Sequence, residues 1–177
     1  MKRIEFEHAI RAAASILGTD ELMVIGSQAL HATIADDLPH AAQRSVEVDI
    51  VAFDDTDEQK ADLIDGSIGE ASMFHATFGY YAQGVSESTA VLPEGWRDRL
   101  IRFETPATNG VVAWCLEVHD LWISKALANR EKDVEFCRAL LAAGIVDRVD
   151  LRARLEVVNG LAVDLRQLVE QRIDGRP

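Results

Sequence analysis

The spacing of hydrophobic residues predicts helices at both ends of the chain and short strands between them. Residues 5–16 place apolar side chains at helical spacing, and Gly18 follows as a stop signal. Residues 22–25 form a continuous apolar run that is typical of a buried strand. Residues 28–34 have helical character, and Ser27 is placed to begin that helix.

The middle of the chain is predicted to contain the remaining strands. Residues 36–43 include a proline and are expected to form a loop, whereas residues 45–53 are rich in β-branched side chains and predict a strand. A polar helix is expected over 56–63, and the Gly- and aromatic-rich residues 66–84 predict a structured loop with a short helix. Further strands are expected over residues 84–92, 100–105 and 111–116.

The last third of the chain is predicted to be helical. One helix is expected from residue 120 to 142 and a second from 149 to 173, with a break at Gly144. The whole pattern predicts an α+β fold, in which a small mixed sheet is flanked by helices. We expect residues 1–116 to form the core and residues 117–177 to pack on it as a helical segment, in a single compact unit.

Composition favours an ordinary globular protein. Hydrophobic residues make up 48% of the 177 residues, yet no apolar run approaches the roughly 20 residues that span a bilayer. The first residues predict an amphipathic helix rather than a signal peptide, so we expect a cytoplasmic protein without a membrane partner. Cys115 and Cys137 lack the spacing of a zinc site and are expected in the core.

The net charge restricts the possible partners. Thirty acidic and 18 basic residues give a net charge of −12, which provides no general attraction to nucleic acid. DNA is therefore not an expected partner, and an RNA partner would need a local basic patch. An acidic surface also suits a basic protein.

Two short motifs carry candidate chemistry. Gly26-Ser27 follows the first predicted strand, and a Gly-Ser turn in that position exposes backbone N–H groups that can hold a phosphate. Side chains of a strand alternate between its faces, so Glu47 and Asp49 project together from α-carbons roughly 6.6 Å apart. Their carboxylates can converge on Mg²⁺, a hard cation that prefers oxygen ligands and often bridges phosphates. A half-exposed strand of an acidic protein would show the same isolated pattern, so the pair alone does not establish a metal site.

The predicted helix 120–142 places charges among its apolar residues. At 100° per residue, Arg130 and Asp133 fall inside the apolar arc, where charges are costly unless they are paired or used. The two residues predict either a buried ion pair or a polar site that borders the helix. Lys125 lies at the edge of the arc, either solvated or within reach of a phosphate, and is roughly 12 Å from Asp133 along a continuous helix. Asp120 is expected to cap this helix.

These motifs together resemble the nucleotidyltransferase superfamily, whose signature is hydrophobic-Gly-[Gly/Ser], a spacer, and Asp-hydrophobic-[Asp/Glu]-hydrophobic. Residues 116–133 resemble the helical motif of an uncharacterised bacterial branch (DUF6036-like), related to AbiEii-like and MenT-like toxin nucleotidyltransferases. The resemblance spans about residues 20–145. It implies metal-dependent transfer of a nucleoside monophosphate from an NTP to a hydroxyl of RNA or protein, by an enzyme of the kind that acts as a toxin controlled by an antitoxin protein.

Transferred to this sequence, the resemblance implies a role for each motif residue. Gly26 and Ser27 would bind the nucleotide, Glu47 and Asp49 would bind Mg²⁺, and Lys125, Arg130 and Asp133 would be the catalytic additions from the helical motif.

The chain departs from the superfamily pattern in its carboxylates and in its spacer. Glu47 stands where the superfamily usually has Asp, and the spacer from Ser27 to Glu47 is longer than usual. A third strand carboxylate is not evident, with Glu70 and Glu104 as the nearest candidates. These departures leave an alternative open, a catalytically inactive binding or interaction module with the same fold.

Overall fold

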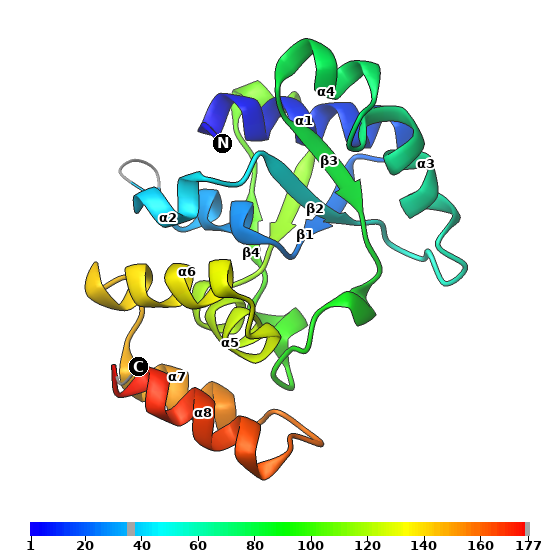
Figure 1. Cartoon of the computed structure of the whole chain (residues 1–177). Helices are drawn as coiled ribbons and strands as arrows, with labels where there is room; N and C mark the ends of the chain where they lie inside the picture. The colour runs from blue at the N-terminus through cyan, green and yellow to red at the C-terminus, as the bar shows by residue number, and fades with distance from the viewer. Residues whose placement is uncertain (35–37, 176–177) are drawn as a thin grey trace.

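The computed structural model describes residues 1–34 and 38–175 and contains a five-stranded mixed sheet (Figure 1). The strands are β1 (Glu21–Val24), β2 (Glu47–Val51), β3 (Tyr81–Gly84), β4 (Ile101–Phe103) and β5 (Val112–Cys115). They are arranged in the order β3-β2-β1-β5-β4. The pairs β2–β3 and β1–β5 are parallel, and β1–β2 and β4–β5 are antiparallel.

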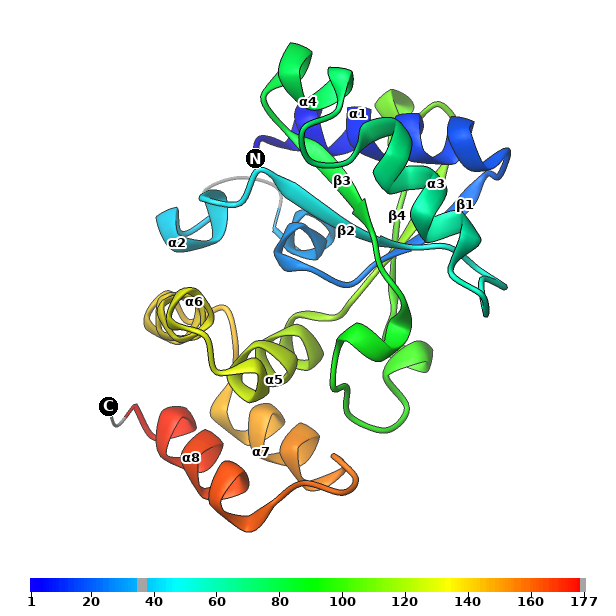
Figure 2. The ribbon, with the colours of Figure 1, turned by 45° about the vertical axis from the view of Figure 1, so that its right-hand side comes forward.

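Helices cover both sides of this sheet. They are α1 (Arg3–Leu17), α2 (His40–Gln43), α3 (Gln59–Ile68), α4 (Met73–Phe78), α5 (Val118–Ala128), α6 (Glu131–Ala142), α7 (Arg148–Glu156) and α8 (Val163–Ile173). Four 3-10 helices accompany them, η1 (Ser27–Ala32), η2 (Glu87–Thr89), η3 (Trp96–Arg99) and η4 (Pro106–Thr108). Helices α1, α3 and α4 lie together on one side of the sheet, and α5 and α6 lie on the other, with α7 and α8 outside them (Figure 1 and Figure 2). The predicted α+β fold with a helical last third is confirmed.

One hydrophobic cluster connects the sheet to the last helices. It includes Phe6 of α1, Met23 of β1, Trp122 of α5 and Ile173 of α8, all 1% exposed or less. Burial of such side chains is the main favourable contribution to folding. In the part of the chain that the structure describes, no helix has the length and apolar character needed to cross a membrane.

Several of the predicted elements differ from the structure. The helix expected over 28–34 is the 3-10 helix η1, the helix expected over 56–63 is α3 at Gln59–Ile68, and residues 36 and 37 of the predicted loop lie outside the described residues. The prediction of a strand over 84–92 is wrong, because β3 ends at Gly84 and the 3-10 helix η2 follows. Ser86 and Ser88 hydrogen-bond each other there through their hydroxyls, and such local bonds compete with strand pairing.

Both long helices predicted in the last third are wrong, because each is two helices. Asn129 ends α5 with a left-handed backbone (φ 57°), and its N–H donates to the carbonyl of Lys125. Asparagine tolerates this conformation better than most residues, so it serves as a helix end. Residues 157–162, with Gly160 at φ 67°, likewise separate α7 from α8.

Candidate functional site

The two strand carboxylates lie on one face of β2, as alternation predicts. Val48 and Ile50 point to the opposite face and are fully buried. The parallel register of β3 places Tyr81 beside Glu47 and Gln83 beside Asp49, so neighbouring side chains on the two strands share a face. The Tyr81 hydroxyl donates to Oε2 of Glu47 at 3.3 Å.

The carboxyl groups of Glu47 and Asp49 interact directly. Burial raises the pKa of Asp49 to about 7, helped by hydrogen bonding to Glu47 and by its negative charge, while Lys125 and Lys132 oppose the shift. Burial also raises the pKa of Tyr81 to about 12, with the Glu47 charge as the next cause. Near neutral pH the acid pair therefore tends to retain a proton, and a cation would replace that proton.

Gly26 packs directly against the carboxyl group of Asp49. A Cβ added to Gly26 would lie 1.6 Å from Oδ2 of Asp49, which no side chain can accommodate without moving the carboxylate. The backbone of Gly26 has φ −91°, so space rather than conformation requires glycine there. The next residue, Ser27, begins η1. The Gly-Ser turn and the acid pair therefore form one local unit.

Lys125, Arg130 and Asp133 meet at the joint between α5 and α6. Nζ of Lys125 lies 3.5 Å from Oδ1 of Asp133, and Nε of Arg130 donates to Oδ2 of Asp133 at 2.6 Å. Asp133 is 2% exposed, so both cations neutralise a buried carboxylate. The hydrogen bond to Asp133 is the main cause that raises the pKa of Arg130.

The expected distance of roughly 12 Å between Lys125 and Asp133 along one helix is thus wrong. The chain turns at Asn129, and this turn brings the beginning of α6 back to the end of α5. Arg130 is the N-cap residue of α6 rather than part of a helical arc. Its ion pair with Asp133 forms and also borders a polar cavity, so the two predicted alternatives occur together.

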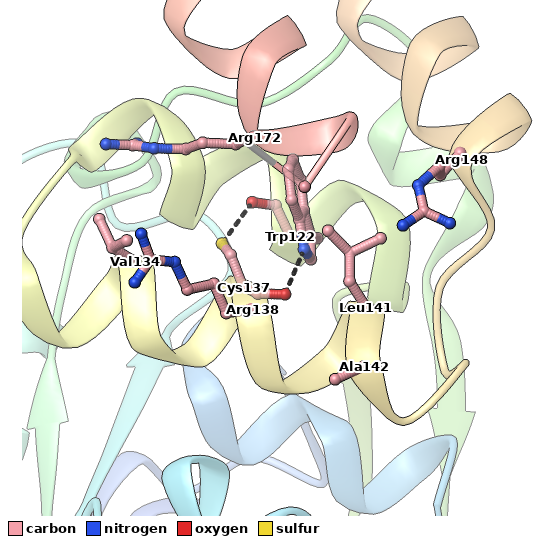
Figure 3. Close-up of a pocket in the computed structure, with 9 residues that line it drawn as sticks. Trp122, Val134, Cys137, Arg138, Leu141, Ala142, Arg148 and Arg172 are labelled. Atoms are coloured by element: carbon pink, nitrogen blue, oxygen red, sulfur yellow. Dashed lines mark hydrogen bonds between the residues drawn. The ribbon is translucent and has the colours of Figure 1, made fainter. Parts of the chain in front are cut away.

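The pairing of α5 with α6 is fixed on the side away from the sheet. Nε1 of Trp122 donates to the carbonyl of Cys137 at 3.0 Å, and Sγ of Cys137 donates to the carbonyl of Trp122 at 3.5 Å (Figure 3). Arg172 of α8 donates to the carbonyl of Ala126 at 2.8 Å and also to the side chain of Asn129. These bonds hold the joint that presents Lys125 and Arg130.

Asp120 does not cap α5, contrary to the prediction. The N-cap is Glu117, whose carboxylate accepts hydrogen bonds from the N–H groups of His119 and Asp120. Asp120 is fully buried and accepts two hydrogen bonds from Arg99, at 2.8 and 2.9 Å. Its role is therefore to anchor α5 to the segment that precedes β4.

All seven predicted site residues line two neighbouring cavities. Four of them line both cavities, namely Glu47, Asp49, Lys125 and Arg130. The first cavity, of about 420 Å³, also includes Ser27, Arg44, Lys132 and Asp133. The second cavity, of about 410 Å³, also includes Gly26, Gln83, Thr89 and Ser124. The structure thus brings the predicted residues together, while their roles stay predictions.

Other polar residues of these cavities were not predicted from the sequence, and four of them lie beside the acid pair or add charge. Tyr81 and Gln83 come from β3, and Arg44 and Lys132 border the first cavity. Tyr81 and Gln83 lie two residues apart, as do Glu47 and Asp49, and this matching spacing was the available signal. Arg44 is bound to Glu135 at 2.6 Å, whereas Lys132 lies within the motif of residues 116–133 and was given no role there.

The donor atoms present suit Mg²⁺ that arrives with a nucleotide. Protein-bound Mg²⁺ commonly uses one or two carboxylates, with substrate phosphates and water as the remaining ligands, and Glu47 and Asp49 supply two. Over residues 1–34 and 38–175 there is no group of three or more His, Cys, Asp or Glu that could hold a metal. The position beside Asp49 on β3 is Gln83. Glu104 pairs with Arg102 on the far strand β4, and Glu70 lines neither cavity.

The fold is α+β, with a mixed sheet that carries an acid pair against a Gly-Ser turn. Cationic side chains from a helical segment face this pair. This combination is that of a nucleotidyltransferase-like protein. The chain belongs to the family described as nucleotidyltransferase of unknown function (DUF6036), whose profile matches residues 5–172. No curated protein and no solved structure was found to match the chain. The relation to AbiEii-like and MenT-like toxins stays a prediction.

Proposed function

We propose that this protein transfers a nucleoside monophosphate from an NTP to a hydroxyl of an RNA or protein acceptor, with Mg²⁺ as cofactor. The observation that supports this most directly is the convergence of the Glu47–Asp49 pair with Lys125 and Arg130 on both cavities. A half-buried acid pair is stabilised by a bound cation, and a nucleoside triphosphate needs cations and hydrogen-bond donors. The two cavities together supply carboxylates for Mg²⁺, and cations and hydrogen-bond donors for the triphosphate.

Each residue then has a physical role. Ser27 donates from its hydroxyl to a phosphate, and Gly26 leaves room for the Asp49 carboxylate. Lys125 steadies the leaving diphosphate together with Arg130, and Asp133 holds both cations toward the cleft. When bound to Glu47 and Asp49, Mg²⁺ would offset phosphate charge and lower the pKa of the attacking hydroxyl.

The test is labelling of an acceptor fraction by radiolabelled NTP. Asp49→Ala should abolish labelling, and so should removal of Mg²⁺ by EDTA in the unchanged protein. Asp164→Ala, at an exposed aspartate in the first turn of α8, is the matched control and should label normally. Full labelling by Asp49→Ala would refute the assignment.

The position of Gln83 favours one second candidate, a nucleotide-binding module without turnover. An amide in place of a carboxylate beside Asp49 leaves the site with two acids, which suits binding with Mg²⁺ better than deprotonation of an acceptor. A diphosphate-release assay beside calorimetry distinguishes the candidates, because both would bind Mg²⁺ and NTP with measurable heat and only the enzyme would release diphosphate. Steady diphosphate release that depends on Asp49 would exclude the module.

We further propose a toxin role, in which an antitoxin protein controls this activity. A basic antitoxin would suit the net charge of −12. Expression of the protein alone should then slow bacterial growth, and Asp49→Ala should remove the effect. Equal growth with the unchanged protein and with Asp49→Ala would argue against a toxin, while leaving nucleotide transfer untouched.

A further inference from the structure

The two cavities of the candidate site differ in how many charged residues line them. Beyond the four residues that both cavities share, the first contains Arg44, Lys132, Asp133 and Glu135. Among the described residues, the second contains no charged residue of its own. Its own lining consists of polar uncharged and small apolar residues, namely Ile25, Gly26, Gln83, Val85, Thr89, Ala90, Ser124 and Ala128.

This difference gives the transfer reaction a direction. A triphosphate belongs in the first cavity, because the Ser27 hydroxyl and the Lys132 ammonium lie there beside the shared cations. In phosphoryl transfer the attacking and leaving oxygens lie roughly in line, on opposite sides of the phosphorus. If the diphosphate leaves into the first cavity, the attacking hydroxyl approaches from the second.

The lining of the second cavity also describes the group that enters it. The end of an RNA strand carries phosphates close to its terminal hydroxyls, and proteins hold single-stranded RNA with cations and stacked aromatic rings. Over residues 1–34 and 38–175, the second cavity has neither a cation of its own nor an aromatic residue in its lining. Gln83, Thr89 and Ser124 instead offer neutral donors and acceptors, which match a peptide backbone and a side-chain hydroxyl.

On the basis of the proposed function, we propose that the second cavity admits the acceptor, and that the acceptor is a Ser, Thr or Tyr hydroxyl of a polypeptide. In the reaction the acceptor oxygen forms a bond to the α-phosphorus. The bond from the α-phosphorus to the oxygen that bridges to the β-phosphorus breaks, and the diphosphate leaves with that electron pair. The hydroxyl proton passes to a solvent water, and the products are a nucleotidylated polypeptide and diphosphate.

Two alanines allow the second cavity to be filled without touching the shared residues. Ala128 is an exposed residue at the end of α5, and Ala90 follows η2 on another wall of the cavity. We expect Ala128→Trp and Ala90→Trp each to lower nucleotide transfer more than tenfold. Their affinity for NTP with Mg²⁺, measured by calorimetry, should stay within twofold of the unchanged protein. Ala153→Trp, at an exposed alanine of α7, is the matched control and should change neither quantity.

The acceptor class is tested with radiolabelled NTP and two fractions of one bacterial lysate, purified RNA and nuclease-treated protein. We expect label in the protein fraction that resists ribonuclease and is lost on protease digestion. Label on RNA would overturn the polypeptide acceptor and leave nucleotide transfer standing. Absence of label from both fractions would count against the proposed function itself, and this inference would fall with it.

The tryptophan variants provide a separate decision about the cavity. If Ala128→Trp and Ala90→Trp weaken NTP binding more than tenfold, the second cavity holds part of the nucleotide, and the inference is wrong. Unchanged transfer in both variants would also overturn it. Circular dichroism melting of the variants beside Ala153→Trp identifies any loss of activity that comes from unfolding.

Discussion

Replacing Asp49 by Asn should make the protein more stable at neutral and alkaline pH. The pKa of Asp49 is raised from 3.8 to about 7 by burial and by Glu47, so the folded state holds a proton that the unfolded state releases between these values. The free energy of unfolding of the unchanged protein therefore falls as pH rises from about 4 to about 7. Above about pH 7 the contribution of Asp49 no longer changes with pH. Each pKa unit corresponds to about 1.4 kcal/mol. Asparagine cannot ionise, so the variant does not lose stability in this way as pH rises.

The size of the effect follows from the same shift. Between pH 5 and pH 8 about two pKa units are traversed, so the stability advantage of Asp49→Asn should grow by about 3 kcal/mol at most. Urea unfolding of both proteins at pH 5, 6, 7 and 8 measures this difference, because titrating groups away from the acid pair contribute equally to both. A stability difference that stays constant across this pH range would refute the proton shared within the acid pair. At pH 8, Mg²⁺ should stabilise the unchanged protein and leave the variant unaffected.

Three further predictions concern the surroundings of the acid pair. Gly26→Ala should displace the Asp49 carboxylate and abolish Mg²⁺ binding in calorimetry, whereas Gly66→Ala, where an added Cβ meets nothing within 4 Å, should leave binding unchanged. Lys125→Met should destabilise the fold by about 1–3 kcal/mol in urea unfolding, since a buried carboxylate loses one of its two cations, and should weaken NTP binding more than tenfold. Arg172→Ala should speed amide hydrogen exchange at the α5–α6 joint, and unchanged exchange there would show that other contacts hold the joint.

The parts of the site that were predictable from sequence are those that local geometry determines. Glu47 and Asp49 share a face because strand alternation has a period of two, whatever the strand pairs with. Gly26-Ser27 follows β1 after a single residue, Ile25, so its position near the strand end needed no tertiary information. The crowding of Gly26 by the Asp49 carboxylate, however, depends on how β1 and β2 pair, and no local pattern contains it.

The contact between Lys125 and Asp133 was not predicted because the apolar spacing continues across a chain turn. Periodicity alone indicated one helix, and the competing signal was the single residue Asn129, a frequent helix end. If Asn129 had been interpreted as a helix end, the sequence would have predicted two helices and a possible contact between Lys125 and Asp133. The neighbours of the acid pair on β3 were missed for another reason, since pairing between separate strands depends on the whole fold.

The candidate site draws its acids from the sheet and its cations from α5 and α6, which follow much later in the chain. During synthesis the acid pair leaves the ribosome first, and Lys125, Arg130 and Lys132 join it only after α5 and the first turn of α6 have been made. A prematurely terminated chain that ends before α5 would thus carry the acid pair without Lys125, Arg130 and Lys132, and could not bind a triphosphate in this way. Under the proposed function, activity appears only in chains that have been translated through α6, so translation itself keeps shorter products inert.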